Sequence, residues 1–175
     1  MTEEYELRSA ETHIEVHKFF PGSIVLVTAI ALVLQSTARV YFPKLEMLDL
    51  PLLVTVYFGL SRRNPSTGLL LGTVIGLLQD ALSGPTVPLG FYGIAKTIVG
   101  YLASSIGARL DTEHPAARFA LTFGFFVLQQ AVLVLTRRLL LAQPELWFNT
   151  HLAVAATVNA LVGTALFLAL DRLRR

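Results

Sequence analysis

Six apolar stretches alternate with short polar or charged segments along the chain. They cover residues 19–38, 47–60, 66–82, 89–107, 119–136 and 151–170. A helix that crosses the hydrocarbon core of a bilayer takes about 20 mostly apolar residues, and most of these stretches approach that length. The pattern therefore predicts an all-α integral membrane protein, a bundle of six transmembrane helices spanning residues 19–171.

Polar residues occupy the two ends of the chain. Residues 1–18 contain five glutamates and predict a polar N-terminal arm. This arm lacks the basic start, apolar centre and small-residue cleavage site of a signal peptide. Residues 172–175 form a short basic tail.

Composition supports the bilayer as the solvent of this chain. The 175 residues are 54% hydrophobic and 15% charged, and the mean hydropathy is +0.61. A soluble domain of this size leaves a large fraction of its surface in water, so it could not hide that much apolar area. A soluble fold is therefore disfavoured.

The distribution of basic residues predicts the orientation of the bundle. Cytoplasmic loops of membrane proteins carry an excess of lysine and arginine. With both termini in the cytoplasm, four basic residues fall outside: Arg39, Lys44, Arg137 and Arg138. Nine fall inside: Arg8, Lys18, Arg62, Arg63, Arg109, Arg118, Arg172, Arg174 and Arg175. We expect a multi-pass membrane protein with both termini in the cytoplasm.

Two consecutive stretches carry rows of glycine. Successive i+4 positions of residues 66–82 hold Gly68, Gly72, Gly76 and then Asp80, and in residues 89–107 Gly93 and Gly100 flank Lys96. Such positions share one face of a helix, and small residues let two helices approach closely. The turn at residues 83–88 holds two prolines. We predict a tightly packed helical hairpin.

Asp80 and Lys96 are charges inside predicted spans. A charge at mid-bilayer costs on the order of 3 kcal/mol, so such residues usually pair, line a cavity or mark function. Because the two spans are antiparallel, we hypothesise a structural ion pair between Asp80 and Lys96. Two alternatives remain: Asp80 as a wetted helix-end residue with Lys96 extending to the surface, or Lys96 as a ligand-binding group.

Catalytic chemistry has little support in the sequence. There is no cysteine, nucleophile elbow, phosphate loop or zinc motif. His13 and His17 have the i, i+4 spacing of a metal pair but no further ligand nearby. We predict no catalytic residue, cofactor or metal, and the short basic tail does not indicate nucleic-acid binding.

The aspartate, turn and lysine together resemble the MreD family. The resemblance rests on the start near Asp49, the Gly68–Gly72 and Gly76–Asp80 runs, Ser83-Gly84, Leu89-Gly90, and Lys96 before Gly100. It implies a bundle similar to the substrate-binding subunits of energy-coupling-factor vitamin transporters.

The resemblance also implies a non-enzymatic scaffold of the cell-elongation (rod) complex. Such a scaffold binds MreC and helps couple MreB filaments to peptidoglycan synthesis by RodA and a class B penicillin-binding protein. Candidate partner contacts lie in the turn and in a later aromatic loop: Gly84, Pro85, Leu89, Gly90, Trp147 and Phe148. Trp147 is equally explained as an interfacial belt residue. A homodimer in which two copies of the chain associate through their glycine faces is a further alternative.

A vitamin-transporter subunit is the alternative function. In that case polar side chains would converge on a ligand in an outer cavity, since polar groups inside a bundle need partners. The candidate residues are Asp80, Lys96, Gln129, Gln130 and Asn159.

Overall fold

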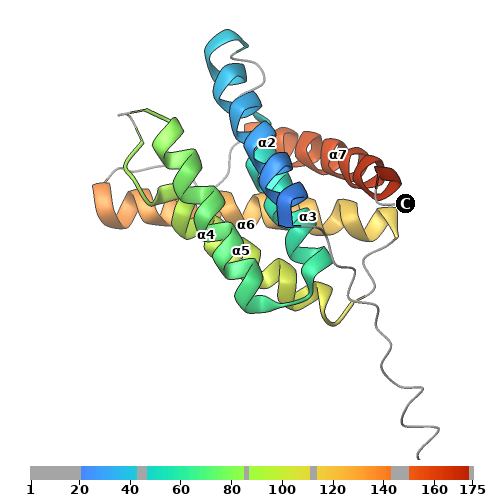
Figure 1. Cartoon of the computed structure of the whole chain (residues 1–175). Coiled ribbons are helices and arrows are strands. Elements are labelled where there is room, and N and C mark those ends of the chain that lie inside the picture. The colour runs from blue at the N-terminus through green and yellow to red at the C-terminus, as the bar shows by residue number, and fades with distance from the viewer. Residues whose placement is uncertain (1–20, 43–46, 85–86, 111–113, 143–149, 174–175) are drawn as a thin grey trace, which may run out of the picture.

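A computed structural model describes residues 21–42, 47–84, 87–110, 114–142 and 150–173. These residues form six helices and no strand (Figure 1), which confirms the all-helical expectation. The helices are α2 (Pro21–Tyr41), α3 (Leu50–Arg62), α4 (Pro65–Leu82), α5 (Phe91–Gly107), α6 (Pro115–Leu141) and α7 (Thr150–Leu173).

Two of these helices are long and apolar enough to cross a membrane, by length and composition. They are Pro115–Leu141 and Thr150–Arg172. Gly22–Ala38 and Leu50–Arg62 are apolar but shorter. A bundle of six membrane-spanning helices therefore stays a prediction, while the helical fold and two candidate spans are established.

Capping residues set where several helices begin. Asp49 Oδ1 accepts a hydrogen bond from the Leu52 backbone N–H at 3.0 Å, and Asn64 Oδ1 accepts one from Ser66 at 3.1 Å. Each cap satisfies a backbone donor that has no partner within the helix. Proline follows in the first turn of both helices, where its missing N–H costs nothing.

The short helix α3 lies at the centre of the bundle. It contacts each of the other five described helices, and residues 51–60 are all buried. A helix that is apolar on every side is stable only when protein or lipid surrounds it completely. Neighbouring helices surround α3, so it can be shorter than a span that faces lipid.

The other helices form two antiparallel pairs and one outer helix. In Figure 1, α4 and α5 run side by side, and so do α6 and α7. Helix α2 packs against α3 and, less extensively, α4. Helices α2 and α4 finish, and α3 and α5 begin, at one end of the bundle, which we call the Asp49 end.

The described helices extend beyond several predicted apolar stretches. Helix α6 covers 27 residues and continues through Arg137 and Arg138 to Leu141, although the apolar stretch ends at residue 136. Arginine is a good helix former, so the pair ends the apolar run without ending the helix. The predicted N-terminal arm at residues 1–18 and the contacts at Pro85, Trp147 and Phe148 lie outside the described residues, as do His13 and His17.

Candidate functional site

A buried ion pair joins α3, α5 and α6. The Lys96 ammonium donates to Asp49 Oδ2 at 2.9 Å and to Gln129 Oε1 at 2.8 Å. The Gln129 amide nitrogen in turn donates to Asp49 Oδ2 at 2.7 Å. Lys96 and Gln129 are fully buried, and the Asp49 residue is 8% exposed. We call this triangle the Asp49–Lys96–Gln129 network.

Asn159 links the network to α7. Its Oδ1 accepts the Asp49 backbone N–H at 2.9 Å, and its amide nitrogen donates to the carbonyl oxygens of Met47 and Ala155. The other carboxylate oxygen of Asp49 caps α3. Each polar group of this cluster therefore has a partner inside the protein, which an environment without water requires.

The predicted ion pair between Asp80 and Lys96 is wrong, because Asp80 caps α5 instead. Its carboxylate accepts three backbone N–H bonds, from Gly90 at 2.9 Å and from Tyr92 and Gly93 at 3.0 Å. Free N–H groups and the helix dipole make the start of a helix a good site for a carboxylate. Lys96 lies one turn further along α5, where Asp49 reaches it.

Burial also excludes the simpler alternative for these two charges. Asp80 is 2% exposed and Lys96 is 0% exposed, so neither a wetted aspartate nor a lysine extending to the surface describes them. The Lys96 ammonium is also 5.0 Å from the centre of the Tyr92 ring. That separation allows a cation–π interaction in addition to the ion pair.

The transporter alternative expects five polar residues to converge on a ligand, and the structure brings only three of them together. Lys96, Gln129 and Asn159 do come together, but around the Asp49 side chain and backbone, with their hydrogen bonds made within the protein. The Asp80 carboxylate caps α5 instead, and Gln130 lines a cavity beside the network, which Asp49 also lines. The network can hold one lysine and one aspartate without water, and it links the start of α3 to α5 and to the middle of α6.

Backbone contact between α4 and α5 occurs at the glycines. A Cβ added at Gly72 would overlap the Lys96 carbonyl, one at Gly76 the Tyr92 carbonyl, and one at Gly100 the Gly68 carbonyl. Gly68 similarly faces Ser104 and Gly100, whereas a Cβ on Gly93 would meet the Leu77 side chain at 3.0 Å. The close approach allows the Thr73 and Thr97 hydroxyls to bond at 2.7 Å. The glycines thus bring the backbone of α4 against that of α5 beside Lys96.

The family model of the rod shape-determining protein MreD matches residues 17–175. The chain belongs to the MreD family. Searches of curated proteins and of solved structures found no match. Membership makes this a rod-shape-determining, membrane-associated protein, as the aspartate, glycine and lysine pattern indicated.

The turn between α4 and α5 is exposed in this MreD-family protein. Leu89 is 74% exposed, and Gly84 and Gly90 have φ values of 79° and 101°. A positive φ is readily adopted by glycine, so both residues suit this sharp turn. Gly84 and Leu89 are therefore exposed at the surface, whereas Gly90 is half-buried.

A second ion pair closes the opposite end of the MreD-family bundle. Arg118 of α6 lies 2.6 Å from Asp171 of α7, and the Tyr57 hydroxyl of α3 donates to the same carboxylate at 3.0 Å. No cluster of three metal-binding side chains occurs in the described part of the chain. The two ends thus differ: one holds buried charges, the other a partly exposed pair.

Proposed function

We propose that this chain is a non-catalytic membrane scaffold of the bacterial cell-elongation complex. In this role it binds MreC and helps couple MreB filaments to peptidoglycan synthesis by RodA and a class B penicillin-binding protein. The observation that carries the proposal is the MreD family match, which extends over residues 17–175. The saturated hydrogen bonds of the Asp49–Lys96–Gln129 network support a structural role for its charges.

The proposed setting is the inner membrane, crossed six times, with both termini in the cytoplasm. The Asp49 end then faces outward, and the ion pair of Arg118 and Asp171 faces the cytoplasm. Because the chain has no cysteine, single cysteines can test this orientation. Leu89→Cys should react with an impermeant thiol reagent from outside and Ser66→Cys only after the membrane is opened. The reverse pattern would overturn the orientation.

An apolar groove between α2 and α4 is the proposed seat of the MreC membrane helix. The groove has a volume of about 450 Å³, and almost all of its lining is apolar. Val25, Leu70 and Val74 line it and are 68%, 64% and 54% exposed. Membrane helices associate by close packing of complementary surfaces, so a groove offers more contact to a helix than a flat face does.

Affinity purification in mild detergent tests the scaffold. The tagged chain should recover MreC together with RodA or a penicillin-binding protein. Val74→Trp, which fills the groove, should reduce MreC recovery, whereas Leu168→Trp on the exposed side of α7 should not. Recovery of paired ATPases and a transmembrane coupling subunit without MreC would identify a transporter subunit instead.

The transporter alternative has weaker support. The polar cavity at the Asp49 end has a volume of about 110 Å³. Pockets for drug-sized ligands measure about 300–1,000 Å³, so this cavity is small for a vitamin. Three of the five residues expected to hold such a ligand bond to one another or to Asp49. The scaffold is the better-supported function.

A further inference from the structure

A polar cavity of about 110 Å³ opens at the Asp49 end, beside the ion pair. Polar side chains from five different segments line it. They are Gln35 of α2, Asp49 before α3, Gln79 of α4, Tyr92 of α5 and Gln130 of α6. Phe126 and Leu48 add apolar surface to the same cavity. Neither the family assignment nor the proposed scaffold role accounts for this cavity.

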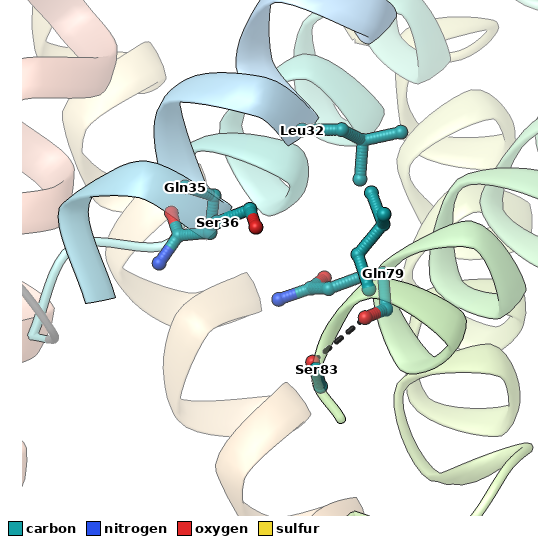
Figure 2. A pocket seen from close by; sticks show the side chains of 6 residues that line it. Leu32, Gln35, Ser36, Gln79 and Ser83 are labelled. Carbon is teal, nitrogen blue, oxygen red and sulfur yellow. Dashed lines mark hydrogen bonds between the residues drawn. The ribbon is translucent and has the colours of Figure 1, made fainter. Parts of the chain in front are cut away.

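Gln79 is the most unusual residue of the lining. It is 3% exposed, and its side-chain oxygen is buried without a hydrogen-bond partner in the described part of the chain. Figure 2 shows a smaller neighbouring pocket that shares Gln35 and Gln79 with this cavity; there the Gln79 amide projects from α4 toward Gln35 and Ser36 of α2. The Ser83 hydroxyl donates to the Gln79 backbone carbonyl at 2.7 Å, so it does not satisfy the side chain. An unpaired buried polar group costs about 1–3 kcal/mol, so a hydrogen-bonding occupant of the cavity that Gln79 lines would remove a cost that no described residue removes.

The two other glutamines also have hydrogen-bonding capacity left over. Gln35 uses its oxygen to accept the Leu50 backbone N–H at 3.0 Å, which leaves its amide nitrogen as a donor. Gln130 makes no side-chain hydrogen bond to any described residue. A carboxamide offers both donors and acceptors. The cavity therefore suits an occupant that both donates and accepts hydrogen bonds.

Charge and volume narrow the chemistry of that occupant. The Asp49 carboxylate forms an ion pair with Lys96, and the Asp80 carboxylate accepts hydrogen bonds from the backbone at the start of α5. The lining therefore offers no unpaired charge to a charged ligand. A volume of about 110 Å³ corresponds to roughly three or four water molecules at about 30 Å³ each. A neutral group with several hydroxyls meets both conditions, because each hydroxyl donates one hydrogen bond and accepts others.

We propose that this cavity binds a neutral polyhydroxyl group of about the size of glycerol. The group belongs either to a free polyol or to a lipid headgroup that enters from the adjacent membrane surface. Its hydroxyls bond to the Gln79, Gln130 and Gln35 amides, and its carbon backbone lies against Phe126. The proposal is independent of the scaffold function and concerns the isolated protein.

The test uses purified protein in three forms: wild type, Gln79→Leu with Gln130→Leu, and the control Thr157→Val. Leucine fills a similar volume without polar atoms, so the double variant should fold. Thr157 is exposed on α7, and its hydroxyl bonds only within its own helix. Circular dichroism checks the fold of each, and Gln130→Leu alone replaces the double variant if that one does not fold.

Two probes distinguish the sources of the ligand. Glycerol is titrated into detergent-solubilised protein while the melting temperature is recorded; the shift seen in the double variant measures the general osmolyte effect. Native mass spectrometry of lipid-loaded protein compares phosphatidylglycerol with phosphatidic acid, which has the same phosphate and acylated backbone but lacks the headgroup glycerol. We expect wild type and Thr157→Val to bind one of the two probes at least about tenfold more tightly than the double variant does, because the double variant loses the hydrogen bonds of two glutamines and one such bond already accounts for about tenfold.

Each result has a defined meaning. A preference for phosphatidylglycerol without a specific glycerol shift identifies a lipid headgroup, and a specific glycerol shift identifies a free polyol. Equal glycerol shifts in all three proteins, together with no lipid preference, would overturn the proposal and leave a cavity that holds only water. Neither result depends on recovery of MreC, so this proposal and the scaffold function fail separately.

Discussion

Replacing Lys96 by methionine is the sharpest perturbation of the buried ion pair. Methionine keeps most of the length of the lysine side chain but removes the ammonium group. In the variant, the Asp49 carboxylate keeps the Gln129 amide and the Leu52 N–H but loses its only cationic partner among the described residues. Lys96→Met therefore tests whether the charge of Asp49 depends on this lysine.

The expected cost of Lys96→Met is large. Removing one partner of a buried ion pair destabilises a protein by about 3–5 kcal/mol, because a buried charge loses its compensation. The Lys96 side chain is 0% exposed and that of Asp49 is 11% exposed, so solvent screens the pair little. Lost packing adds little, because the volumes of methionine and lysine are similar.

Asp49→Asn provides the matched partner change. Asparagine can still cap α3 through its side-chain oxygen, so it removes the charge and keeps the cap. Each single variant leaves one charge uncompensated, whereas Asp49→Asn with Lys96→Met leaves none. The double variant should therefore be at least about 2 kcal/mol more stable than the sum of the single changes predicts.

Unfolding of the purified protein in mixed micelles, followed by circular dichroism, measures these differences. Asp80→Asn combined with Lys96→Met is the control cycle, and its coupling should be clearly smaller than that of the Asp49 cycle, because Asp80 bonds to backbone N–H groups of α5 and Lys96 forms its ion pair with Asp49. Rescue of Lys96→Met by Asp80→Asn, with no rescue by Asp49→Asn, would refute the assigned pairing.

Three further changes test the packing and the caps by the same unfolding measurement. Gly72→Ala should cost about 1–3 kcal/mol because its Cβ would overlap the Lys96 carbonyl, whereas Gly124→Ala, with open space around the glycine, should be neutral; equal effects would contradict backbone contact. Asp80→Ala should cost about 2 kcal/mol or more, because three N–H groups lose their acceptor, and an unchanged stability would contradict the cap. Arg118→Gln should cost less than about 1 kcal/mol, because its pair with Asp171 is partly exposed; a loss as large as that of Lys96→Met would contradict this difference.

Local sequence signals predicted much of the helical structure. An apolar run is a property of consecutive residues, so helix positions could be inferred directly from the six stretches. The i+4 glycines likewise predicted the face on which α4 meets α5, because a helical face depends only on spacing. The family match over residues 17–175 agrees with the pattern found in the same region.

The partner of Lys96 could not be found in this way. Asp80 is 16 residues away in sequence and Asp49 is 47, which favoured Asp80. In the sequence, Asp49 marks only the start of a short apolar stretch, although an aspartate that begins an apolar helix is also a buried charge. One carboxylate oxygen of Asp49 caps α3, and the other binds Lys96. Sequence spacing does not indicate that one side chain does both.

The sequence by itself determined a helical, membrane-associated chain with a close glycine contact, because hydrophobic periodicity and small-residue spacing are properties of single helices. Only the tertiary structure decided that α3 lies at the centre, that Asp49 holds Lys96, and that three glutamines surround a small cavity. The physical reason is that a buried charge or amide is satisfied by whichever group lies within hydrogen-bond reach. That distance is set by how the helices pack, and not by their order along the chain.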